Sequence, residues 1–410
     1  MAGSNKALII GGGIAGPITA ILLKKAGIEA TVFEAWPRSK GIGGGLQIAP
    51  NGMHVLAEAG LANEIIHRGA VCESIEFISQ AGDPLASANR ELAKRFGQPA
   101  VSMRRATLND AILARAERDG IEVIFSKRLV GIEDLPDRPI AVHFEDGTSA
   151  EGNFVIGADG VHSATRRHVV PDGPAPCDTG LISFGGFVPR ALLEAAGAGP
   201  SLFMTFGRSG FFGYGYCSSE PDGAMCWSTQ PIHGIDAATF RAMDQKALQR
   251  YLGFLHAGWH KPIPQLLEVL NEVVVTATLD IATLPFWSRD RTLLIGDAAH
   301  ATSPHAGQGA SLALEDALRL AIFLQRGQDL RVTFQNFERE RRERAERMVA
   351  IARRNGNQKR KFSATGAWVR DQMLKLLIPL NSHGNDWIYG YDPRVTPRLE
   401  TSGQRDRQAA

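Results

Sequence analysis

The 410-residue chain has few cysteines, no C-x-x-C pair and no long apolar run. Its four cysteines, Cys72, Cys177, Cys217 and Cys226, are widely separated. This spacing argues against a dithiol redox centre, a zinc ribbon and a disulfide framework, so we expect a reducing compartment and no metal site. No apolar stretch reaches the roughly 18 residues that a membrane span requires, and residues 1–6 are too short for a secretory signal. We therefore expect a cytoplasmic protein.

An excess of charge of one sign is also missing. The 45 Lys and Arg residues are balanced by 43 Asp and Glu residues, which gives a formal net charge of +2 and no general field for attracting nucleic acid or anionic lipid. One segment, residues 339–361, is locally basic, and we interpret it as a solvated helix packed on the rest of the protein, with no nucleic-acid or membrane partner. Its Glu/Arg pairs at a helical spacing of four are Glu338/Arg342, Glu340/Arg344 and Glu343/Arg347.

The chain opens with a strand–turn–helix–strand pattern. The apolar run at residues 6–10 leads into Gly-Gly-Gly-Ile-Ala-Gly at residues 11–16, then a helical stretch and a second strand at residues 30–34. This is G-x-G-x-x-G in a βαβ setting, where glycines allow a tight turn and a close approach of the backbone to a pyrophosphate at the helix N-terminus. Glu34 ends the second strand, where it can accept hydrogen bonds from a ribose. The pattern predicts a dinucleotide site, for FAD or NAD, formed by Gly11, Gly13, Ile14, Ala15, Gly16 and Glu34.

The character of the sequence then changes twice. Short β-rich runs separated by Gly, Ser and Pro-Asp-Gly turns are typical of an antiparallel sheet, and a later buried strand leads through a glycine-rich loop into a helix. We expect an α/β protein in which a Rossmann-like domain is interleaved with a mostly antiparallel β-sheet substrate domain and followed by C-terminal helices. The predicted parts are residues 1–176 and 286–330 for the nucleotide domain, 177–285 for the β-rich domain, 331–395 for the helices and 396–410 for a disordered tail. Residues 385–392 are aromatic enough to pack against the protein.

Two later segments decide between FAD and NAD. Residues 159–166 read D-G-x-x-S-x-x-R at a strand end, and residues 296–309 contain G-D followed by P-H-A-G-Q-G. Together with the first glycine motif, over about residues 7–354, they resemble the group A flavin monooxygenases, the para-hydroxybenzoate hydroxylase-like family. No second G-x-G-x-x-G follows a strand, in agreement with a family in which NADH or NADPH visits transiently.

The resemblance implies FAD as the cofactor and assigns residues to it. Arg105, in preference to the adjacent Arg104, is the cation near the pyrophosphate. Asp159 lies near the same group, and Asp297 hydrogen-bonds the ribityl chain. The loop at residues 304–309 passes along the isoalloxazine, and the N-terminus of the next helix faces the pyrimidine edge of the flavin. The other cofactor residues implied in this region are Gly296, Pro304, Gly307, Gln308 and Gly309.

The resemblance also implies the reaction. NADPH or NADH reduces the flavin, and O2 then hydroxylates an aromatic or heteroaromatic, phenolic small molecule through a flavin C4a-hydroperoxide. The alternatives are a flavin epoxidase, a Baeyer–Villiger type oxygenase and a tetracycline-inactivating oxygenase, which share the motifs and differ in pocket shape. The protein must exclude water and position the ring. We expect the small-molecule substrate and O2 as partners, in a monomer or homodimer.

The β-rich segment carries the candidate substrate contacts. Phe212, Tyr214 and Tyr216 share one face of a strand, and the polar ends of the two tyrosines are suited to hydrogen bonding. The other candidate aromatic residues of the pocket wall are Phe203, Phe206, Phe211 and Trp227.

Two polar residues are candidates for orienting or deprotonating the substrate. His305 stands beside Pro304, and the pKa of an imidazole ordinarily lies near neutrality; a loop histidine satisfied by the backbone is the alternative. Gln47 occupies the region where some relatives place a catalytic histidine or an arginine, which leaves the identity of any base open. Neither Arg190 nor Arg208 has the setting of a carboxylate clamp, so we expect a neutral phenolic or heteroaromatic compound.

Overall fold

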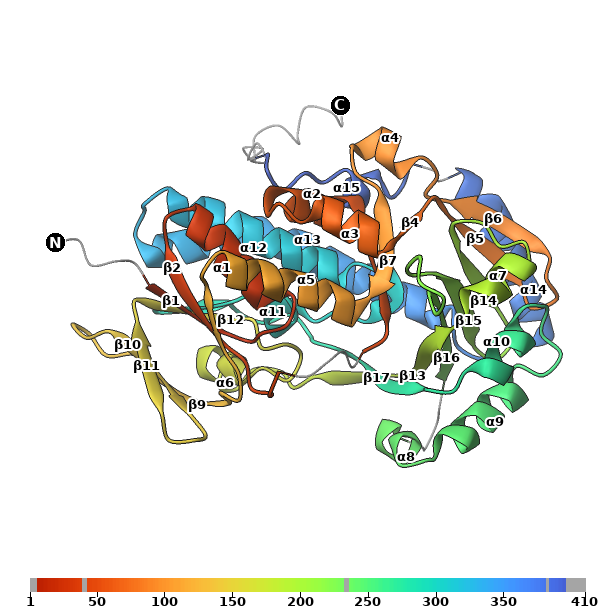
Figure 1. Ribbon diagram of the computed structural model, residues 1–410, viewed down its shortest axis with the longest axis horizontal. Coiled ribbons are helices and arrows are strands. Elements are labelled where there is room, and N and C mark those ends of the chain that lie inside the picture. Colours follow the sequence, from red (N-terminus) through yellow and green to blue (C-terminus); the bar gives the residue numbers. More distant parts are fainter. Residues whose placement is uncertain (1–5, 39–42, 232–235, 381–382, 396–410) are drawn as a thin grey trace, which may run out of the picture.

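The computed structural model describes residues 6–38, 43–231, 236–380 and 383–395 (Figure 1). The tail at residues 396–410, predicted to be disordered, lies outside the described residues. Two large sheets lie in opposite halves of the molecule, and long helices extend from one half towards the other (Figure 1). We call these halves the parallel-sheet part and the seven-stranded part.

The parallel-sheet part is built on six strands in the order β18-β19-β12-β1-β2-β8. All neighbouring strands pair in parallel except β18 and β19. The strands are β1 (Lys6–Ile10), β2 (Glu29–Phe33), β8 (Glu122–Ile124), β12 (Phe154–Gly157), β18 (Ser288–Arg289) and β19 (Thr292–Leu294). Because β19 follows the second sheet in the chain, the parallel sheet is completed only after the chain returns from the seven-stranded part.

Alternate residues of β1 enter two different cores. Ala7 and Ile9 pack with the helices on one face, and Leu8 and Ile10 pack with a three-stranded sheet on the other. The covering helices are α1 (Ala15–Lys25), α5 (Arg105–Arg118), α12 (Gly309–Gln325) and α13 (Leu330–Asn357), and the small sheet is β9 (Leu129–Glu133), β10 (Ile140–Phe144) and β11 (Ser149–Gly152). Other elements here are β3 (Gly45–Ile48), β4 (Ala70–Cys72), β7 (Ala100–Arg104), α2 (Pro50–Glu58), α3 (Ala62–Arg68), α4 (Leu92–Phe96), α6 (Ala164–Val169), α11 (Asp297–His300) and a 3-10 turn η1 (Pro304–Ala306).

The seven-stranded part has the order β17-β13-β16-β15-β14-β5-β6, with β14 and β5 parallel and every other pair antiparallel. Its strands are β5 (Ser74–Ser79), β6 (Pro84–Ala88), β13 (Cys177–Val188), β14 (Ser201–Phe206), β15 (Phe211–Tyr216), β16 (Ala224–Pro231) and β17 (Val274–Asp280), and its helices are α7 (Arg190–Ala195), α8 (Ala237–Arg241), α9 (Gln245–Leu255), α10 (Ile263–Val269) and α14 (Ala364–Leu380). The sheet extends beyond residues 177–285, since β5 and β6 join it. The predicted α/β class, with a mostly antiparallel sheet interleaved with a Rossmann-like one, is confirmed.

The helix α13 packs on the parallel-sheet part, as predicted, and its packed side also carries charge. Arg341 is fully buried and pairs with Glu315 and Asp316 of α12. Arg344 also pairs with Glu315, and Glu340 pairs with Arg319. Of the three predicted pairs within the helix, Glu338/Arg342 forms, while Glu340 and Arg344 take partners on α12 instead and Glu343/Arg347 shows no ion pair among the described residues.

The aromatic segment near the C-terminus packs as predicted. It forms α15 (Asp386–Tyr389), in which Ile388 and Tyr389 are buried. Arg344 donates hydrogen bonds to the carbonyl oxygens of Trp387 and Ile388, at 2.8 and 3.0 Å. Within the described ranges, no helix combines the length and apolar character needed to cross a membrane.

Candidate active site

The glycine loop between β1 and α1 is shaped by two close backbone approaches. A Cβ on Gly16 would lie 1.9 Å from the carbonyl oxygen of Gly11, and a Cβ on Gly11 would lie 2.3 Å from that of Ala158. Gly11 also has a φ of +114°, which disfavours other residues. Gly13 differs, because a Cβ there would meet no described atom within 4 Å. The loop is therefore folded tightly on itself and leaves open space in front of Gly13.

Side chains from two neighbouring elements hold this loop. The Glu34 carboxylate accepts hydrogen bonds from the backbone N–H groups of Gly12 (2.6 Å) and Trp36 (2.9 Å). Asn109 of α5 donates to the carbonyl oxygens of Gly12 and Gly13, at 3.1 and 3.0 Å. Asn109 was not among the predicted site residues, although it lies one helical turn after Arg105 and so shares a face with it.

The structure brings the first and last motifs together. Gly296, just after β19, lies against the first residue of α1: a Cβ built on it would be 3.5 Å from the Cβ of Ala15 and 3.2 Å from that of Ala313. The glycine loop, the start of α1 and the Gly296–Asp297 pair therefore form a single site at the carboxyl ends of β1 and β19, where open parallel sheets bind ligands.

Asp297 keeps its carboxylate free of protein donors. No group in the described part of the chain donates a hydrogen bond to it. Burial raises its pKa above the ordinary value, against an opposing effect of the Arg105 guanidinium. Arg105 is exposed, whereas Arg104 donates to Asp222 and lies 3.8 Å from the centre of the Phe187 ring. Of the two arginines, Arg105 is the one whose side chain has no hydrogen-bond or ion-pair partner among the described residues.

Two helix N-termini at this site lack the usual caps. Neither α1 nor α12 has a side-chain cap or an acidic residue in its first turn, so their first N–H groups are available to an anion or a carbonyl. Gly309 starts α12, and a Cβ built on it would lie 4.0 Å from Asp297 Oδ1. Gln308 is buried and accepts from Asn51 at 3.0 Å. Open space at Gly13, a carboxylate without donors and uncapped helices together fit a dinucleotide whose phosphates and hydroxyls supply the missing partners.

The D-G-x-x-S-x-x-R motif lies beside the glycine loop, and the side chains that define it, Asp159, Ser163 and Arg166, make hydrogen bonds within the protein. The Asp159 carboxylate accepts hydrogen bonds from Ser163 Oγ and from the N–H and hydroxyl of Thr165, so it is occupied at the start of α6. Arg166 is buried and donates to the carbonyl oxygens of Ala298 and Val161. The motif ties β12 to the segment after β19.

Tyr214 and Tyr216 lie away from this site. With Phe212 they share one face of β15, as predicted, but that face packs against α8, α9 and α10. The Tyr216 hydroxyl donates to the Ala198 carbonyl oxygen at 3.0 Å. Tyr214 is 3% exposed, stacks on Phe203 with ring centres 4.9 Å apart, and burial raises its pKa. Their placement supports a structural role in the core between the seven-stranded sheet and these helices, which we call the outer core.

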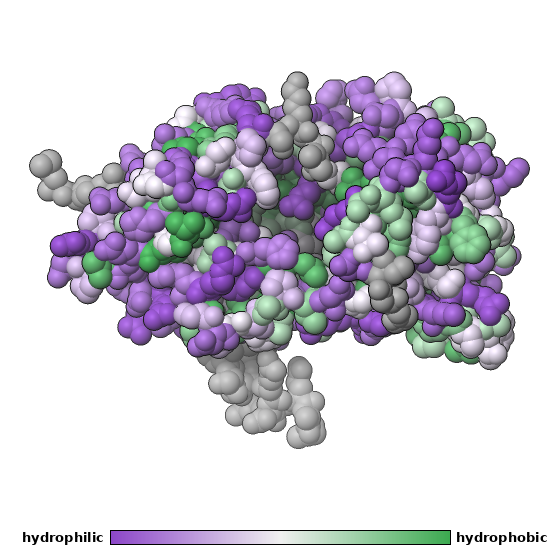
Figure 2. Space-filling view, turned by 90° about the horizontal axis from the view of Figure 1, so that it is seen from below, coloured by the Kyte–Doolittle hydropathy of each residue, from purple (hydrophilic) through white to green (hydrophobic). Residues whose placement is uncertain are grey.

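The opposite face of the same sheet borders the nucleotide site. Trp227 lies over Gly213, where a Cβ would be 2.3 Å from the indole, and a Cβ on Gly45 would be 2.2 Å from the sulfur of Met225. This face packs with Ala49, Leu312 and Ala306 of the parallel-sheet part. Seen from below, the surface is hollowed between the two parts, with hydrophobic residues in and beside the hollow (Figure 2). The apolar side chains on this face are Phe187, Leu202, Met204, Phe206, Phe211, Met225 and Trp227.

His305 and Gln47 both reach this border. His305 lies on η1, exposed Pro304 precedes it, and Gly307 follows with a φ of +62°. Burial, together with the nearby Lys359, lowers the pKa of His305 to about 3, so the expectation that this imidazole titrates near neutrality is wrong. The Nε2 atoms of His305 and Gln47 are buried without a hydrogen-bond partner among the described residues.

Known proteins resemble this chain over almost its whole length. Residues 4–352 match the family described as FAD binding domain. The chain is 28% identical over 405 residues to 6-hydroxynicotinate 3-monooxygenase of Bordetella bronchiseptica, covering 98% of each protein. It is 30% identical over 398 residues to 3-amino-4-hydroxybenzoate 2-monooxygenase PtmB3 of Streptomyces platensis, covering 94% of this chain and 95% of the relative. The crystal structure of Klebsiella pneumoniae HpxO complexed with FAD and uric acid superposes with a TM-score of 0.82 at 28% identity, covering 92% and 94%.

Proposed function

The chain belongs to the FAD binding domain family and is an FAD-dependent monooxygenase, and we propose that it hydroxylates an aromatic or heteroaromatic ring that already carries a hydroxyl group. Two relatives are named for hydroxylated aromatic substrates, a hydroxynicotinate and an aminohydroxybenzoate. The observation that most supports the proposal is the contact of Gly296 with the start of α1, which joins the two cofactor motifs in one site beside an apolar sheet face.

The proposed roles follow the positions of the residues. Bound FAD, reduced by transient NADH or NADPH, supplies the activation of O2 and the transfer of one oxygen atom. Gly11, Gly13 and Gly16, with Ile14 and Ala15, admit the pyrophosphate to the N-terminus of α1. Glu34 holds the ribose of the ADP half, Arg105 offsets phosphate charge, and Asp297 accepts hydrogen bonds from ribityl hydroxyls. Segment 304–309 and the uncapped start of α12 border the flavin ring.

The apolar sheet face has the second task. Trp227 and Met225 keep water away from the reacting centre and present an apolar surface to the substrate ring, and the fully buried Phe211 supports the Trp227 indole. Because the polar groups near this face are Gln47 and His305, each with a buried Nε2 atom that lacks a partner, we assign them to hydrogen bonding with flavin or substrate.

The remaining parts of the proposal concern the whole chain. We assign residues 1–176, apart from β5 and β6, and residues 286–330 to the FAD-binding domain, and residues 177–285 together with β5 and β6 to the substrate domain. A cytoplasmic location is supported by four cysteines that are all free thiols. The partners that we propose are a small aromatic molecule and O2. We expect a monomer or a homodimer, and light scattering of the purified protein distinguishes these two states.

The function is tested with the purified yellow holoprotein and a panel of phenols and hydroxypyridines. A true substrate should stimulate NADH or NADPH oxidation and give a product heavier by one oxygen atom on the same ring. An epoxide or a ring-expanded lactone would favour the alternative oxygenases. A protein that retains no FAD would contradict the proposal altogether.

Asp297→Ala should weaken FAD binding by about tenfold to a hundredfold, because charge-assisted hydrogen bonds contribute about 1.5–3 kcal/mol. The melting temperature of the FAD-free protein should not fall, since no donor in the described ranges would be lost with this carboxylate. Asp159→Ala is the contrasting variant: it removes the acceptor at the start of α6 and should destabilise the FAD-free protein by about 1 kcal/mol or more. Flavin fluorescence titration and thermal unfolding measure the two effects. Equal behaviour of both variants would refute these roles.

A further inference from the structure

A buried lysine at the end of α13 lies in the proposed active site without an established role. Lys359 is 8% exposed and comes two residues after the last residue of the helix. Its N–H donates to the carbonyl oxygen of Gly356 at 2.9 Å, and the N–H of Phe362 donates to that of Arg208 at 2.7 Å. The segment that carries Lys359 is thus fixed against the hairpin joining β14 and β15.

The Lys359 ammonium group meets His305 on the apolar sheet face. Its Nζ lies 3.2 Å from His305 Nδ1 and 3.9 Å from the centre of the Phe211 ring. The helix end approaches closely here: a Cβ on Gly356 would lie 2.7 Å from the imidazole, and Asn355 donates to the His305 carbonyl oxygen at 3.2 Å. Both His305 and Lys359 are therefore held in place by the end of α13.

The hydrogen bond between them fixes which groups remain available. Because an ammonium group only donates, His305 Nδ1 is the acceptor and the ring hydrogen lies on Nε2. That Nε2–H is buried and has no acceptor among the described residues. Lys359 has further N–H bonds to donate. The Nε2 side of the ring faces Gly356, where a Cβ would lie 3.3 Å from it, so Lys359 Nζ is the donor that the pair can offer to a ligand.

The charge of this pair is also uncompensated. Within residues 6–38, 43–231, 236–380 and 383–395, no carboxylate lies within 4.0 Å of Lys359 Nζ. The deeply buried arginines between α12 and α13 differ, since Arg319 pairs with Glu340 and Arg341 pairs with Glu315 and Asp316. An unpaired buried ammonium is costly, and burial lowers the pKa of Lys359 to about 7. An anion bound at this point would remove that cost.

We propose that Lys359 Nζ, positioned by its hydrogen bond to His305 Nδ1, binds an anionic oxygen of the substrate, so that the enzyme acts on aromatic rings bearing an ionised hydroxyl or a carboxylate. This inference rests on the proposed function and narrows its substrate class. It replaces the expectation of a neutral ring, which considered Arg190 and Arg208 as the possible clamps. Arg190 pairs with Glu194 beside the outer core, and the exposed Arg208 shows no ion pair among the described residues.

The test titrates the FAD-loaded enzyme with three rings of one shape: pentafluorophenol and pentafluorobenzoate, both ionised at neutral pH, and neutral pentafluorobenzamide. Binding is followed by the perturbation of flavin absorbance. At least one anionic probe should bind about tenfold more tightly than the amide. A phenolate preference identifies a ring hydroxyl as the natural anion, and a benzoate preference identifies a carboxylate.

Lys359→Met should abolish the preference for the anionic probe while FAD content stays complete. Lys361→Met is the matched control, because Lys361 is exposed and lies two residues away, and it should keep the preference. Lys359→Arg should retain part of it. If Lys359→Met does not fold, Lys359→Gln takes its place, and the comparison of probes on the unmodified enzyme needs no variant.

Equal binding of the anionic and neutral probes to the unmodified enzyme would overturn this inference. The same conclusion follows if Lys359→Met keeps the anion preference. In either case an enzyme that still binds FAD and hydroxylates a ring leaves the proposed function intact. Loss of FAD binding by the unmodified enzyme would instead overturn the proposed function.

Discussion

Asp159 and Asp297 both follow strands of the same parallel sheet, yet they have opposite surroundings. Asp159 accepts three hydrogen bonds at the start of α6, whereas Asp297 has no donor among the described residues. The sequence predicts the position of each carboxylate, because strand ends and glycines mark it. Whether protein groups already donate hydrogen bonds to a carboxylate depends on the donors that the fold brings close to it, such as those of Thr165. The sequence pattern does not reveal these contacts.

Lys359 and His305 could not be assigned from the sequence for a related reason. Lys359 falls within a basic run that has the composition of a solvated helix, and only the close approach permitted by Gly356 places it on His305. Burial is a property of the packed chain. The same holds for the pKa of His305, which depends on its neighbours.

Lys359→Met should stabilise the protein without substrate by roughly 2–4 kcal/mol at pH 6, where the folded wild type still carries the buried ammonium. Since the folded-state pKa is about 7 and the ordinary value is 10.5, the unfolded chain binds more protons between these values. The free energy of unfolding of the wild type therefore rises with pH between these two pKa values, and its difference from that of Lys359→Met should become smaller. Denaturant unfolding at several pH values measures it. A gap that is constant with pH, or shared by Lys361→Met, would contradict the buried charge.

At the scale of elements, strand alternation predicts which residues share a face but not which layer that face meets. The pattern Phe-Phe-Gly-Tyr-Gly-Tyr in β15 correctly groups Phe212, Tyr214 and Tyr216. The face with the larger polar aromatics was assigned to the substrate. That face packs against α8, α9 and α10, and the glycine-rich face, where Gly213 leaves room for the Trp227 indole, borders the nucleotide site.

The ion network between α12 and α13 supports the site from behind. Asp316 accepts from the N–H of Gly296 at 2.9 Å and from His300 at 2.6 Å, while Arg341 neutralises Asp316 and Glu315 together. Burial raises the pKa of Asp316, but His300 and Arg341 lower it further, to about 2 in balance. The network fixes the backbone just before Asp297.

Arg341→Met should destabilise the protein by about 3 kcal/mol or more, because it leaves two buried carboxylates without their shared cation. FAD affinity should fall as well, since Gly296 loses its fixed acceptor. Arg339→Met, on the exposed side of the same helix, should change stability by less than about 0.5 kcal/mol. Thermal unfolding and flavin titration report both. Similar losses in the two variants would show that the network does not carry this stability.

The variants Gly13→Ala and Gly16→Ala distinguish the space needed by the cofactor from the close packing of the glycine loop. A Cβ at Gly13 meets no described atom, so the FAD-free protein should keep its melting temperature while FAD binding weakens at least tenfold. A Cβ at Gly16 would collide with Gly11, so this variant should lose stability even without FAD. Unimpaired FAD binding by Gly13→Ala would contradict the placement of the pyrophosphate.

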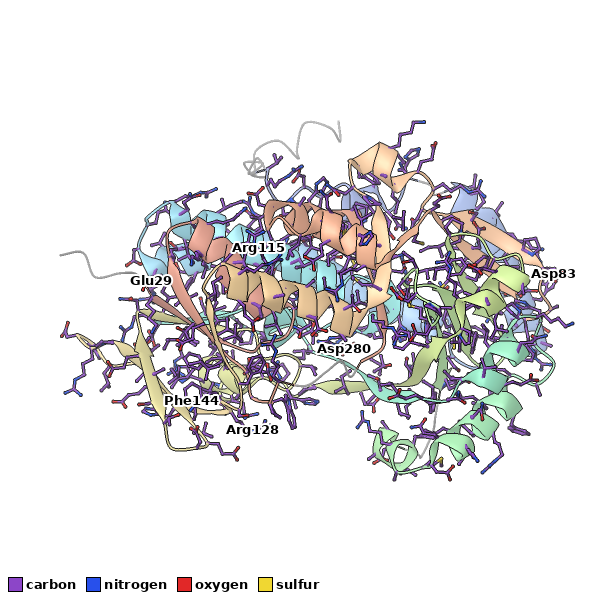
Figure 3. The ribbon with its side chains drawn as sticks, viewed as in Figure 1. Glu29, Asp83, Arg115, Arg128, Phe144 and Asp280 are labelled. Carbon is purple, nitrogen blue, oxygen red and sulfur yellow. The ribbon has the colours of Figure 1, made fainter. Side chains whose placement is uncertain are left out.

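For the whole molecule, the interleaving of two sheets could be predicted because the chain returns to its first sheet at β19 with a recognisable motif. The ion pairs that join the parallel-sheet part to the seven-stranded part could not be predicted. Asp280, labelled at the end of β17 in the middle of the molecule (Figure 3), pairs with Arg353 of α13 at 2.7 Å, so α13 is tied to the second sheet as well as to α12. Long-range ion pairs of this kind leave no trace in local sequence patterns.

We propose that this chain transfers one atom of O2 to an aromatic ring beside its flavin. The most direct measurement is turnover of the best substrate from the panel under 18O2 in ordinary water, followed by mass spectrometry of the product. We expect the new hydroxyl to carry 18O, with about one NADH or NADPH consumed for each labelled product. An unlabelled hydroxyl, or consumption of reductant that yields only hydrogen peroxide for every phenol tested, would contradict the account.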